Sequence, residues 1–296
     1  MLSILIPTYN HNVFQLVTRL NNELETVEIP YEILVFDDNS SEPLPDNDRI
    51  VTYKKTHLKK LSKNIGRSAI RLQLAQAAAY DWILFLDADV MPVASNFIQK
   101  YVDACSNTAQ EVLFGGISYA EEKPPKKQLL RWEYGRNREV QPVKERQKKP
   151  HFVITQNVLI KKETYLSLPI PTENFYGDDL VFSQELKRKN SNVLHIENPV
   201  LHLGLESSEK YLKKALSAVK SIVMLEENGT LDNDLTKLQQ TYLQLKRYRL
   251  LGVFKLYFSA KKKKMEQNLL SSTPNLRWFD LYRLLYYIEL KSEKNA

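Results

Sequence analysis

Residues 82–90 read Trp-Ile-Leu-Phe-Leu-Asp-Ala-Asp-Val, a short apolar run that ends in two carboxylates one residue apart. A run of this length predicts a buried strand, and in an open parallel sheet ligands bind just beyond the carboxyl ends of the strands. Asp87 and Asp89 would stand at such an end, where their oxygens suit a hard divalent cation that also holds diphosphate oxygens. The alternative is a surface turn in which both aspartates accept backbone hydrogen bonds, because aspartate is common in turns.

The composition is that of a globular protein with a sizeable core: 296 residues, of which 43% are hydrophobic and 26% are charged. The formal net charge of +7 favours anionic partners such as nucleotide sugars, nucleic acid or an acidic lipid surface. The single cysteine, Cys105, excludes an intramolecular disulfide and is consistent with a reducing compartment.

The N-terminus does not resemble a signal peptide, because Pro7 follows directly after the short apolar run at residues 2–6. No run approaches the roughly 20 apolar residues that span a bilayer. We therefore expect a cytoplasmic protein, with peripheral contact on the inner face of the cell membrane.

Strand-like and helix-like segments alternate through the first 90 residues. Strands are expected at residues 2–6, 31–36, 50–53 and 82–86, and helices at residues 13–24 and 66–80. Such alternation predicts an α/β fold, with a mostly parallel central sheet flanked by helices.

The strand ends of this sheet would gather polar side chains at one edge, namely Thr8, Tyr9, Asp37, Asp38, Asp87 and Asp89. A carboxylate at Asp37 or Asp38 can accept the N3–H of a uracil ring, while Tyr9 can stack on the base. Arg67 and Arg71 lie on one helix face by their i, i+4 spacing, where they would meet a diphosphate or tie down the aspartates. The alternative for this pair is a solvated helix face.

Dinucleotide binding on such a sheet usually needs a glycine-rich turn after the first strand. The corresponding turn here, residues 7–11, contains no glycine, and neither G-x-G-x-x-G nor G-x-x-x-x-G-K-[ST] occurs in the chain. The sequence therefore gives no support to an NAD site or a P-loop.

Four segments resemble, in the same order, the motifs of the family 2 glycosyltransferases with the GT-A fold: SILIPTYN at residues 3–10, DDNS at 37–40, NIGRSA at 64–69 and FLDAD at 85–89. The resemblance covers residues 1–205 and implies a GT-A catalytic domain there. It also implies a nucleotide-sugar site, most simply for a UDP-sugar, formed by Pro7, Thr8, Tyr9, Asp37, Asp38, Asn64, Arg67, Arg71, Asp87 and Asn157.

Residues 175–180, Phe-Tyr-Gly-Asp-Asp-Leu, predict the start of a helix, and an acidic pair there is typical of an N-terminal cap. The pair also resembles the family's Glu/Asp-Asp motif, whose second acid is the general base of an inverting transfer. Asp178 stands where the family more often has Glu. The resemblance thus implies Asp179 as the base, with Asp178 beside it.

A histidine in the run at residues 198–204 completes the metal site that the resemblance implies. His202 matches the family histidine that returns to the metal better than His195 does, so that Asp87, Asp89 and His202 would hold Mn²⁺ or Mg²⁺. For either histidine the alternative is a structural hydrogen-bonding role.

The middle of the chain predicts strands at residues 111–117, 152–160, 192–196 and 199–203, and a mobile loop with a helical piece at residues 121–150. Within that loop, residues 129–138 mix aromatic and basic side chains, which suits sugar stacking and phosphate binding. An aromatic helix that packs on the domain, with its arginines in water, explains the same pattern.

The last third, residues 206–296, predicts a helical C-terminal region, because apolar residues recur there at helical spacing and glycine and proline nearly vanish. Residues 242–265 predict a basic amphipathic helix that can lie in a lipid interface. The alternative is a helix that packs on the catalytic domain with a solvated lysine edge.

These features together predict a metal-dependent inverting glycosyltransferase, with hexosyl or N-acetylhexosaminyl specificity. It would move a sugar from a UDP-sugar to a hydroxyl of a glycan or lipid-linked acceptor in cell-surface polysaccharide synthesis. The alternatives are a nucleotidyltransferase-like protein, which would favour a glycine-rich N-terminal loop, and a non-catalytic nucleotide-sugar-binding protein. No nucleic-acid partner is expected, because no RNA- or DNA-binding motif accompanies the positive charge.

Overall fold

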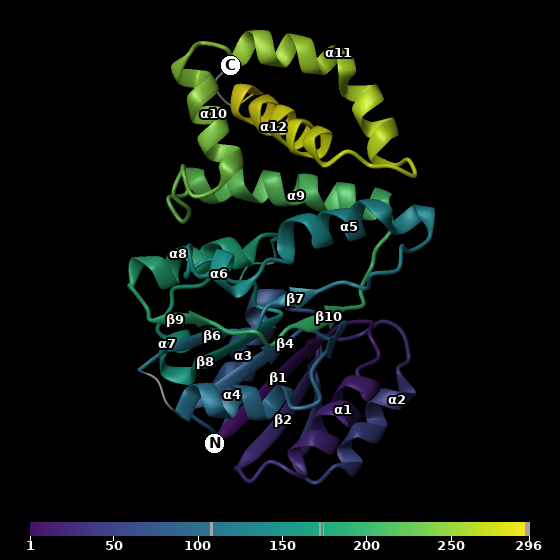
Figure 1. Cartoon of the computed structure of the whole chain (residues 1–296), viewed down its shortest axis with the longest axis vertical. Coiled ribbons are helices and arrows are strands. Elements are labelled where there is room, and N and C mark those ends of the chain that lie inside the picture. The colour runs from purple at the N-terminus through teal and green to yellow at the C-terminus, as the bar shows by residue number, and fades with distance from the viewer. Residues whose placement is uncertain (107–108, 172, 174, 294–296) are drawn as a thin grey trace. The chain divides into compact units, whose positions relative to one another are not determined.

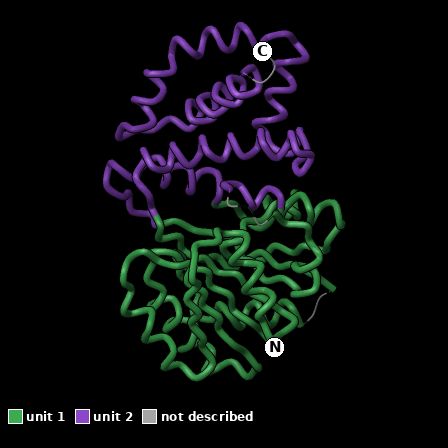
Figure 2. The backbone as a smooth tube through the Cα atoms, turned by 180° about the vertical axis from the view of Figure 1, so that it is seen from behind, with its two compact units in different colours: residues 1–119, 140–174, 182–204 green, residues 120–139, 175–181, 205–296 purple. Residues whose placement is uncertain are grey.

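The computed structural model describes residues 1–106, 109–171, 173 and 175–293. The chain forms two units, shown in different colours in Figure 2. The first unit comprises residues 1–119, 140–174 and 182–204, and the second comprises residues 120–139, 175–181 and 205–296. The expected division into a catalytic domain at 1–205 and a helical region at 206–296 stays a prediction.

The main sheet of the first unit has the strand order β3-β2-β1-β4-β8-β6-β9 (Figure 1). Its strands are β1 (Leu2–Thr8), β2 (Tyr31–Asp37), β3 (Thr56–Lys60), β4 (Trp82–Leu86), β6 (Val112–Phe114), β8 (Asn157–Lys161) and β9 (Val193–His195). The strands β1, β2, β3 and β4 pair in parallel, and β8 runs antiparallel to β4 and β6. The predicted α/β fold with a largely parallel sheet is confirmed.

A smaller sheet with the order β5-β10-β7 follows the acidic end of β4. It consists of β5 (Val90–Pro92), β7 (Ile117–Ser118) and β10 (Val200–His202). β10 pairs antiparallel with β5, which places His202 opposite Val90. This pairing brings the chain near residue 202 back to the segment that follows Asp89.

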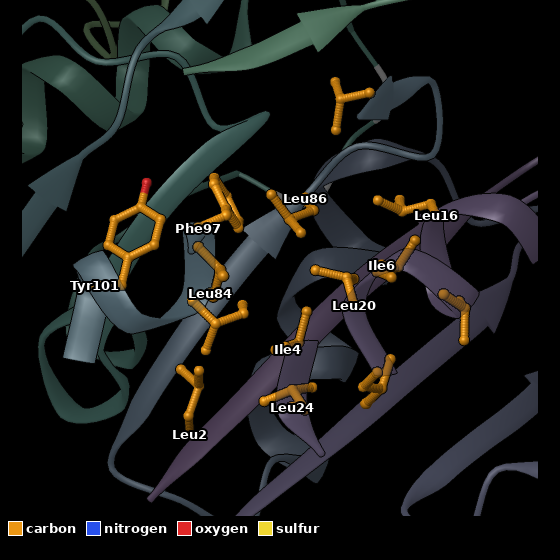
Figure 3. Packing of buried hydrophobic residues seen from close by; sticks show 14 of the residues in the cluster. Leu2, Ile4, Ile6, Leu16, Leu20, Leu24, Leu84, Leu86, Phe97 and Tyr101 are labelled. Atoms are coloured by element: carbon orange, nitrogen blue, oxygen red, sulfur yellow. The ribbon is translucent and has the colours of Figure 1, made fainter. Parts of the chain in front are cut away.

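The helices of the first unit cover a sheet whose central strand is buried. In β1, the successive residues Ile4, Leu5 and Ile6 are all fully buried, as expected for a parallel strand covered on both faces. Leu16 and Leu20 of α1 pack toward Ile4 and Ile6 (Figure 3). The helices are α1 (Phe14–Leu24), α2 (Pro45–Asp48), α3 (Arg67–Ala77), α4 (Phe97–Ser106), α6 (Val143–Arg146), α7 (Lys162–Leu166) and α8 (Asp178–Arg188), of which α8 begins in the second unit.

The strand expected at residues 50–53 is wrong. Residues Arg49–Thr52 form a 3₁₀ helix, and the third parallel strand is β3. Ile50 is fully buried but its neighbour Val51 is exposed, so the apolar pair does not line a strand face. The apolar pattern did not predict β3, because β3 is an edge strand of the sheet, where lysines are common.

Two other expected strands are shorter than predicted. Residues 111–117 are divided at Gly115 and Gly116 into β6 and β7, and the strand expected from residue 152 begins only at Asn157. Phe152, which extended the apolar pattern, is exposed.

The stretch at residues 121–150 is more helical than the mobile loop that was expected. It contains a 3₁₀ helix (Lys126–Gln128), α5 (Leu129–Tyr134), a π-helix (Gly135–Glu139) and α6. Its last part is anchored in the first unit by the buried guanidinium of Arg146. That group donates hydrogen bonds to the carbonyl oxygens of Phe114 at 3.1 Å and Ile196 at 2.9 Å.

The second unit contains the predicted C-terminal helices, which are α9 (Ser208–Glu227), α10 (Lys237–Arg247), α11 (Leu251–Leu269) and α12 (Leu276–Glu293). The buried carboxylate of Glu226 ties three of them together. It accepts hydrogen bonds from the Gln239 amide at 2.6 Å and the Tyr287 hydroxyl at 2.6 Å, and it pairs with Lys291 at 2.5 Å. Within the described residues, no helix is long and apolar enough to cross a membrane.

The single helix expected at residues 242–265 is wrong, because α10 ends at Arg247 and α11 begins at Leu251. The N–H of Leu250 donates to the carbonyl of Leu245, and the N–H of Arg249 donates to Lys246. These two bonds form a Schellman motif, with Arg249 in the left-handed region at φ 58°. Periodicity did not reveal this end, because the left-handed position is occupied by arginine rather than glycine.

Gly115 generates a stability prediction, because a Cβ at this position would overlap the carbonyl oxygen of Asn198 and the hydroxyl of Tyr101. We expect Gly115→Ala to lower the free energy of unfolding by about 1–3 kcal/mol or more. Gly252→Ala is the control, since nothing lies within 4 Å of its added Cβ and alanine favours a helix by up to about 1 kcal/mol. Urea denaturation of both variants checks the contrast, and equal stability of the two would contradict it.

Candidate functional site

The loops after β1 and β2 are held together at the carboxyl edge of the sheet. Thr8 pairs with Asp37 in the register of the two strands, and the N–H of Asp38 donates to the carbonyl of Thr8 at 2.8 Å. The N–H of Asn10 donates to Ser40 Oγ at 2.8 Å, and the Asn10 side chain accepts from the N–H of Ser41 at 2.8 Å. The two polar loops therefore form one surface.

Asp37 and Asp38 have different surroundings, although both are buried. Asp37 Oδ1 accepts hydrogen bonds from the N–H and the hydroxyl of Ser40, at 2.9 and 2.6 Å. Both carboxylate oxygens of Asp38 accept backbone N–H groups, from Ile65 at 2.7 Å and Gly66 at 2.9 Å. Asp38 thus fixes the segment that leads into α3, next to Asn64.

Tyr9 differs from its neighbours in the predicted nucleotide site because its side chain is half exposed. Thr8 is buried and donates its hydroxyl to the carbonyl of His11 at 2.9 Å. Tyr9 has 50% exposure, and Asn64 is also exposed. Among these residues, Tyr9 is thus the aromatic surface on which a base can stack.

The two arginines at the start of α3 lie beside Asp87. Arg71, whose side chain is 3% exposed, pairs with Asp87 Oδ1 at 2.6 Å, and the more exposed Arg67 lies 3.6 Å from Oδ2. Burial alone would raise the pKa of Asp87, but the charges of Arg71 and Arg67 and the hydrogen bond from Arg71 hold this pKa below its usual value. Arg71 therefore ties down an aspartate, whereas Arg67 lies near the same carboxylate and stays partly exposed.

Asp89 lies beside His202. Asp89 Oδ2 lies 3.5 Å from His202 Nε2, and the N–H of Leu203 donates to the Asp89 carbonyl at 2.8 Å. The ring of the buried Tyr119 lies against the imidazole, with 5.3 Å between ring centroids. Gly204 provides the space for the carboxylate, since a Cβ there would overlap Asp89 Oδ2 and lie 2.7 Å from Cγ.

The donor set fits a divalent cation in part. In the described ranges, no three His, Cys, Asp or Glu side chains converge closely enough to hold a metal ion. An oxygen and a nitrogen 3.5 Å apart can, however, both lie about 2.1 Å from one cation, and Mg²⁺ is typically bound by one or two carboxylates together with substrate phosphates. Asp89 and His202 therefore suit a cation whose other ligands come from a diphosphate or water. The role of Asp87 as a third ligand stays a prediction.

Asn157 is fully buried, and its side-chain amide is used inside the protein. Its Nδ2 donates to the carbonyl oxygens of Gly116 at 2.8 Å and Asn198 at 2.9 Å, and its Oδ1 accepts from the Tyr101 hydroxyl at 2.7 Å. Burial raises the pKa of Tyr101 well above its usual value, so this phenol stays a donor. Asn157 would therefore affect a bound sugar only indirectly, by holding in place the strand ends that it joins.

Asp178 and Asp179 occupy the first turn of α8, as predicted, in the part of the helix that belongs to the second unit. Asp178 is 5% exposed, whereas Asp179 is partly exposed. Of the two acids, only Asp179 can be reached from outside the protein.

The aromatic and basic segment at residues 129–138 is engaged within the second unit. Arg131 pairs with Glu139 through two hydrogen bonds of 3.0 and 3.1 Å, and Arg138 pairs with Asp280 at 2.7 Å. Arg136 is exposed and stacks over the Trp132 ring. The packing alternative therefore describes Arg131 and Arg138 better than phosphate binding does.

The structure brings together Thr8, Tyr9, Asp37, Asp38 and the segment before α3, and it joins Arg67 and Arg71 to Asp87. Sequence reasoning missed the residues that hold this arrangement in place, namely Asn10, Ser40, Tyr101, Tyr119, Asn198 and Gly204. Gly204 carried a signal, because a glycine two residues after a candidate metal ligand indicates close approach. His195 is structural, as its Nε2 lies 2.8 Å from the Pro150 carbonyl and its Nδ1 lies 3.3 Å from the Arg146 guanidinium.

A comparison with protein families matches residues 3–166 to the model described as Glycosyl transferase family 2. Among solved structures, the mannosyltransferase PcManGT from Pyrobaculum calidifontis, in complex with GDP-Man and Mn²⁺, is similar with a TM-score of 0.60 and 13% identity, over 99% of this chain and 86% of that one. The 1–349 fragment of S. aureus TarS, in complex with UDP-GlcNAc, has a TM-score of 0.50 and 15% identity, over 100% and 92%. At these identities the likeness shows the fold, which is GT-A. No curated protein matches the sequence.

The pair of Arg71 and Asp87 predicts a pH-dependent stability. We expect Asp87→Asn to lower the free energy of unfolding at pH 7 by about 3–5 kcal/mol, because it removes the charge 2.6 Å from a buried guanidinium. Since the folded pKa lies below the usual 3.8, this contribution is complete above about pH 4 and is lost as the pH falls through the folded value.

Urea denaturation at a series of pH values measures this difference between wild type and Asp87→Asn. Asp46→Asn is the control, because its exposed pair with Arg49 is worth only about 0–1 kcal/mol. If Asp87→Asn were no less stable than Asp46→Asn at pH 7, the ion pair would not have the role assigned to it.

The close contact between Gly204 and Asp89 predicts that a larger residue at position 204 weakens metal binding. Gly204→Ala must displace the carboxylate of Asp89, so we expect Mn²⁺-dependent binding of UDP to weaken by about 10- to 100-fold, as for other residues that orient a metal ligand. Calorimetry with UDP in the presence and absence of Mn²⁺ measures the effect, and Asp89→Ala sets its upper limit. Wild-type affinity in Gly204→Ala would show that the position of this carboxylate does not matter.

Proposed function

The chain belongs to glycosyl transferase family 2, and we propose that it is a metal-dependent inverting enzyme that uses a UDP-sugar. The acceptor would be a hydroxyl of a glycan or a lipid-linked glycan in cell-surface polysaccharide synthesis, and the sugar a hexose or an N-acetylhexosamine. The observation that carries the proposal is the meeting of Tyr9, Asp37, Arg67 and Asp87 with the pair of Asp89 and His202 at one sheet edge.

The exposed groups of this edge supply the contacts that a UDP-sugar needs. Tyr9, at 50% exposure, would stack on the base. Asp37 is buried and its Oδ1 is bonded to Ser40, so its Oδ2 would be the oxygen that accepts the N3–H of uracil. Arg67, whose side chain is 46% exposed, can reach a phosphate oxygen, whereas Arg71 is buried and holds Asp87. Asp38 contributes indirectly, through the loop that its two oxygens fix.

The leaving group would depart from the cation side of this edge. Asp89 and His202 would hold Mn²⁺ or Mg²⁺, which when bound neutralises charge on the departing nucleoside diphosphate. The solved neighbour with GDP-Man and Mn²⁺ has the same fold, which supports a divalent metal for this chain without deciding which one.

Asp179 is the general base in this proposal. The acceptor hydroxyl would give its proton to this carboxylate as its oxygen attacks the anomeric carbon, while the bond to the diphosphate breaks with its electron pair on the leaving oxygen. Asp179 is partly exposed and Asp178 is buried, which supports the assignment of the reachable acid as the base.

Release of nucleoside diphosphate from a panel of UDP-sugars and GDP-mannose, with Mn²⁺ or Mg²⁺, tests the proposal. We expect metal-dependent turnover with a UDP-sugar. In Asp179→Asn, turnover should fall by about 10²- to 10⁴-fold with unchanged UDP affinity, because the amide keeps the shape but cannot take a proton. Asp178→Asn is the matched control and should lose less.

The possible outcomes separate the proposal from its alternatives. A larger loss in Asp178→Asn than in Asp179→Asn would reverse the two roles. Full activity in both variants would refute the inverting mechanism with this base. Metal-dependent binding of a UDP-sugar without turnover on any acceptor would favour the non-catalytic alternative.

A further inference from the structure

The loop before α11 and the first turns of that helix expose large apolar side chains. These residues, called here the α11 patch, are Tyr248 at 67% exposure, Leu250 at 45%, Val253 at 66%, Leu256 at 79% and Tyr257 at 54%. An isolated exposed apolar residue is ordinary, but five of them within ten consecutive residues mark an interaction surface.

The patch is the outer face of a helix that is already packed on its other side. Met265 and Leu269 of α11 are buried, and Phe254 and Phe258 pack against the same core cluster as these two. Successive residues turn by 100° around a helix, so Leu256 lies on the opposite side, with Val253 next to it and Tyr257 at its flank. The core of the second unit therefore does not account for them.

Basic residues flank the patch on both sides along the chain. There is no acidic residue between Asp234 and Glu266, whereas that stretch contains nine lysines and arginines. These nine positive charges exceed the net charge of the whole chain, which is +7, so the rest of the chain has no excess of positive charge. The exposed basic residues nearest the patch are Lys246, Arg247, Arg249, Lys261, Lys263 and Lys264.

Two local features shape this surface. The left-handed residue Arg249 ends α10 and turns the chain into α11, so Tyr248 and Leu250 stand at a bend beside the first turn of the helix. Lys262 is oriented differently from its neighbours, as its ammonium pairs with Glu289 at 2.8 Å. Lys261, Lys263 and Lys264 are the exposed members of the lysine run.

We propose that the α11 patch is a docking surface for an anionic lipid membrane. A basic helix with exposed aliphatic and aromatic residues lies in a lipid interface through burial of its apolar side chains and attraction of its charges to acidic headgroups. A second copy of the chain would bring like charges together. A nucleic acid would leave Leu256 and Val253 facing water. The inference is independent of the proposed activity.

Co-sedimentation of the full chain with vesicles tests the proposal. The vesicles contain phosphatidylcholine alone, or phosphatidylcholine with a third of phosphatidylglycerol. We expect binding to the anionic vesicles, weak binding to the neutral ones, and loss of binding at high salt, because salt screens the attraction.

Two variants separate the charged and the apolar parts of the surface. The triple change Lys261→Glu, Lys263→Glu and Lys264→Glu should weaken binding by about a hundredfold or more, since each basic residue contributes about fivefold. It spares Lys262 and so keeps the pair with Glu289. The double change Val253→Gln and Leu256→Gln should also weaken binding, while it preserves a good helix former at both exposed positions.

Matched controls carry the same changes elsewhere on the surface of the first unit. Lys54, Lys144 and Lys149 are exposed lysines for a triple change to Glu, and Val51 and Val93 are exposed valines for a double change to Gln. Both controls should bind anionic vesicles as the wild type does.

Several results would overturn the proposal. These are no binding of the wild type to anionic vesicles at low salt, equal binding to neutral vesicles, and equal loss in the controls and the patch variants. Sedimentation velocity that shows a dimer abolished by Val253→Gln and Leu256→Gln, without vesicle binding, would assign the patch to a second copy. Patch-dependent binding of a labelled RNA, again without vesicle binding, would assign it to nucleic acid.

Discussion

A buried guanidinium needs an anion beside it, and the pair of Arg71 and Asp87 meets this requirement at the edge of the main sheet. Arg71 is nearly inaccessible to solvent, so its charge would be costly without the carboxylate 2.6 Å away. The pair joins the start of α3 to the end of β4. The Asp38 carboxylate fixes the segment before α3 to the end of β2. The edge that carries the candidate site therefore depends on charges that are satisfied within the protein.

The sequence predicted those elements of the fold whose apolar pattern reflects burial. β1, β2, β4 and α1 line the core, and their residues could be recognised one by one. β3 was not predicted, because an edge strand has only one neighbour and carries lysines. The segment around Ile50 was wrongly predicted as a strand, because its apolar residues include only one that is buried. The break between α10 and α11 depends on a backbone conformation at Arg249 that residue type does not predict. In each case the deciding factor was a neighbour or a torsion angle, not the local composition.

The sequence predicted that these strand ends meet at one edge, but it did not predict the contacts between their side chains. Asp87 and Asp89 are separated by one residue, yet one faces Arg71 and the other faces His202. Their different partners follow from what surrounds the strand end, with Arg71 of α3 paired with Asp87 and His202 of β10 beside Asp89. Asn157 was named for a sugar contact, but the structure surrounds its amide with Tyr101, Gly116 and Asn198. Spacing along the chain identified which residues gather there, while their partners depend on contacts between elements far apart in sequence.

The distribution of charge gives a physical reason for a cation at this edge. The net charge of +7 favours anionic partners in general, yet the positive excess lies between Asp234 and Glu266, in the second unit. At the end of β4, Asp87 and Asp89 stand one residue apart, and the buried Arg71 is committed to Asp87. A diphosphate that approached Asp87 and Asp89 without a cation would meet a local balance of negative charge, at separations where Coulomb repulsion is not fully screened. A divalent cation held by Asp89 and His202 would reverse that balance, so donor binding and metal binding should each strengthen the other.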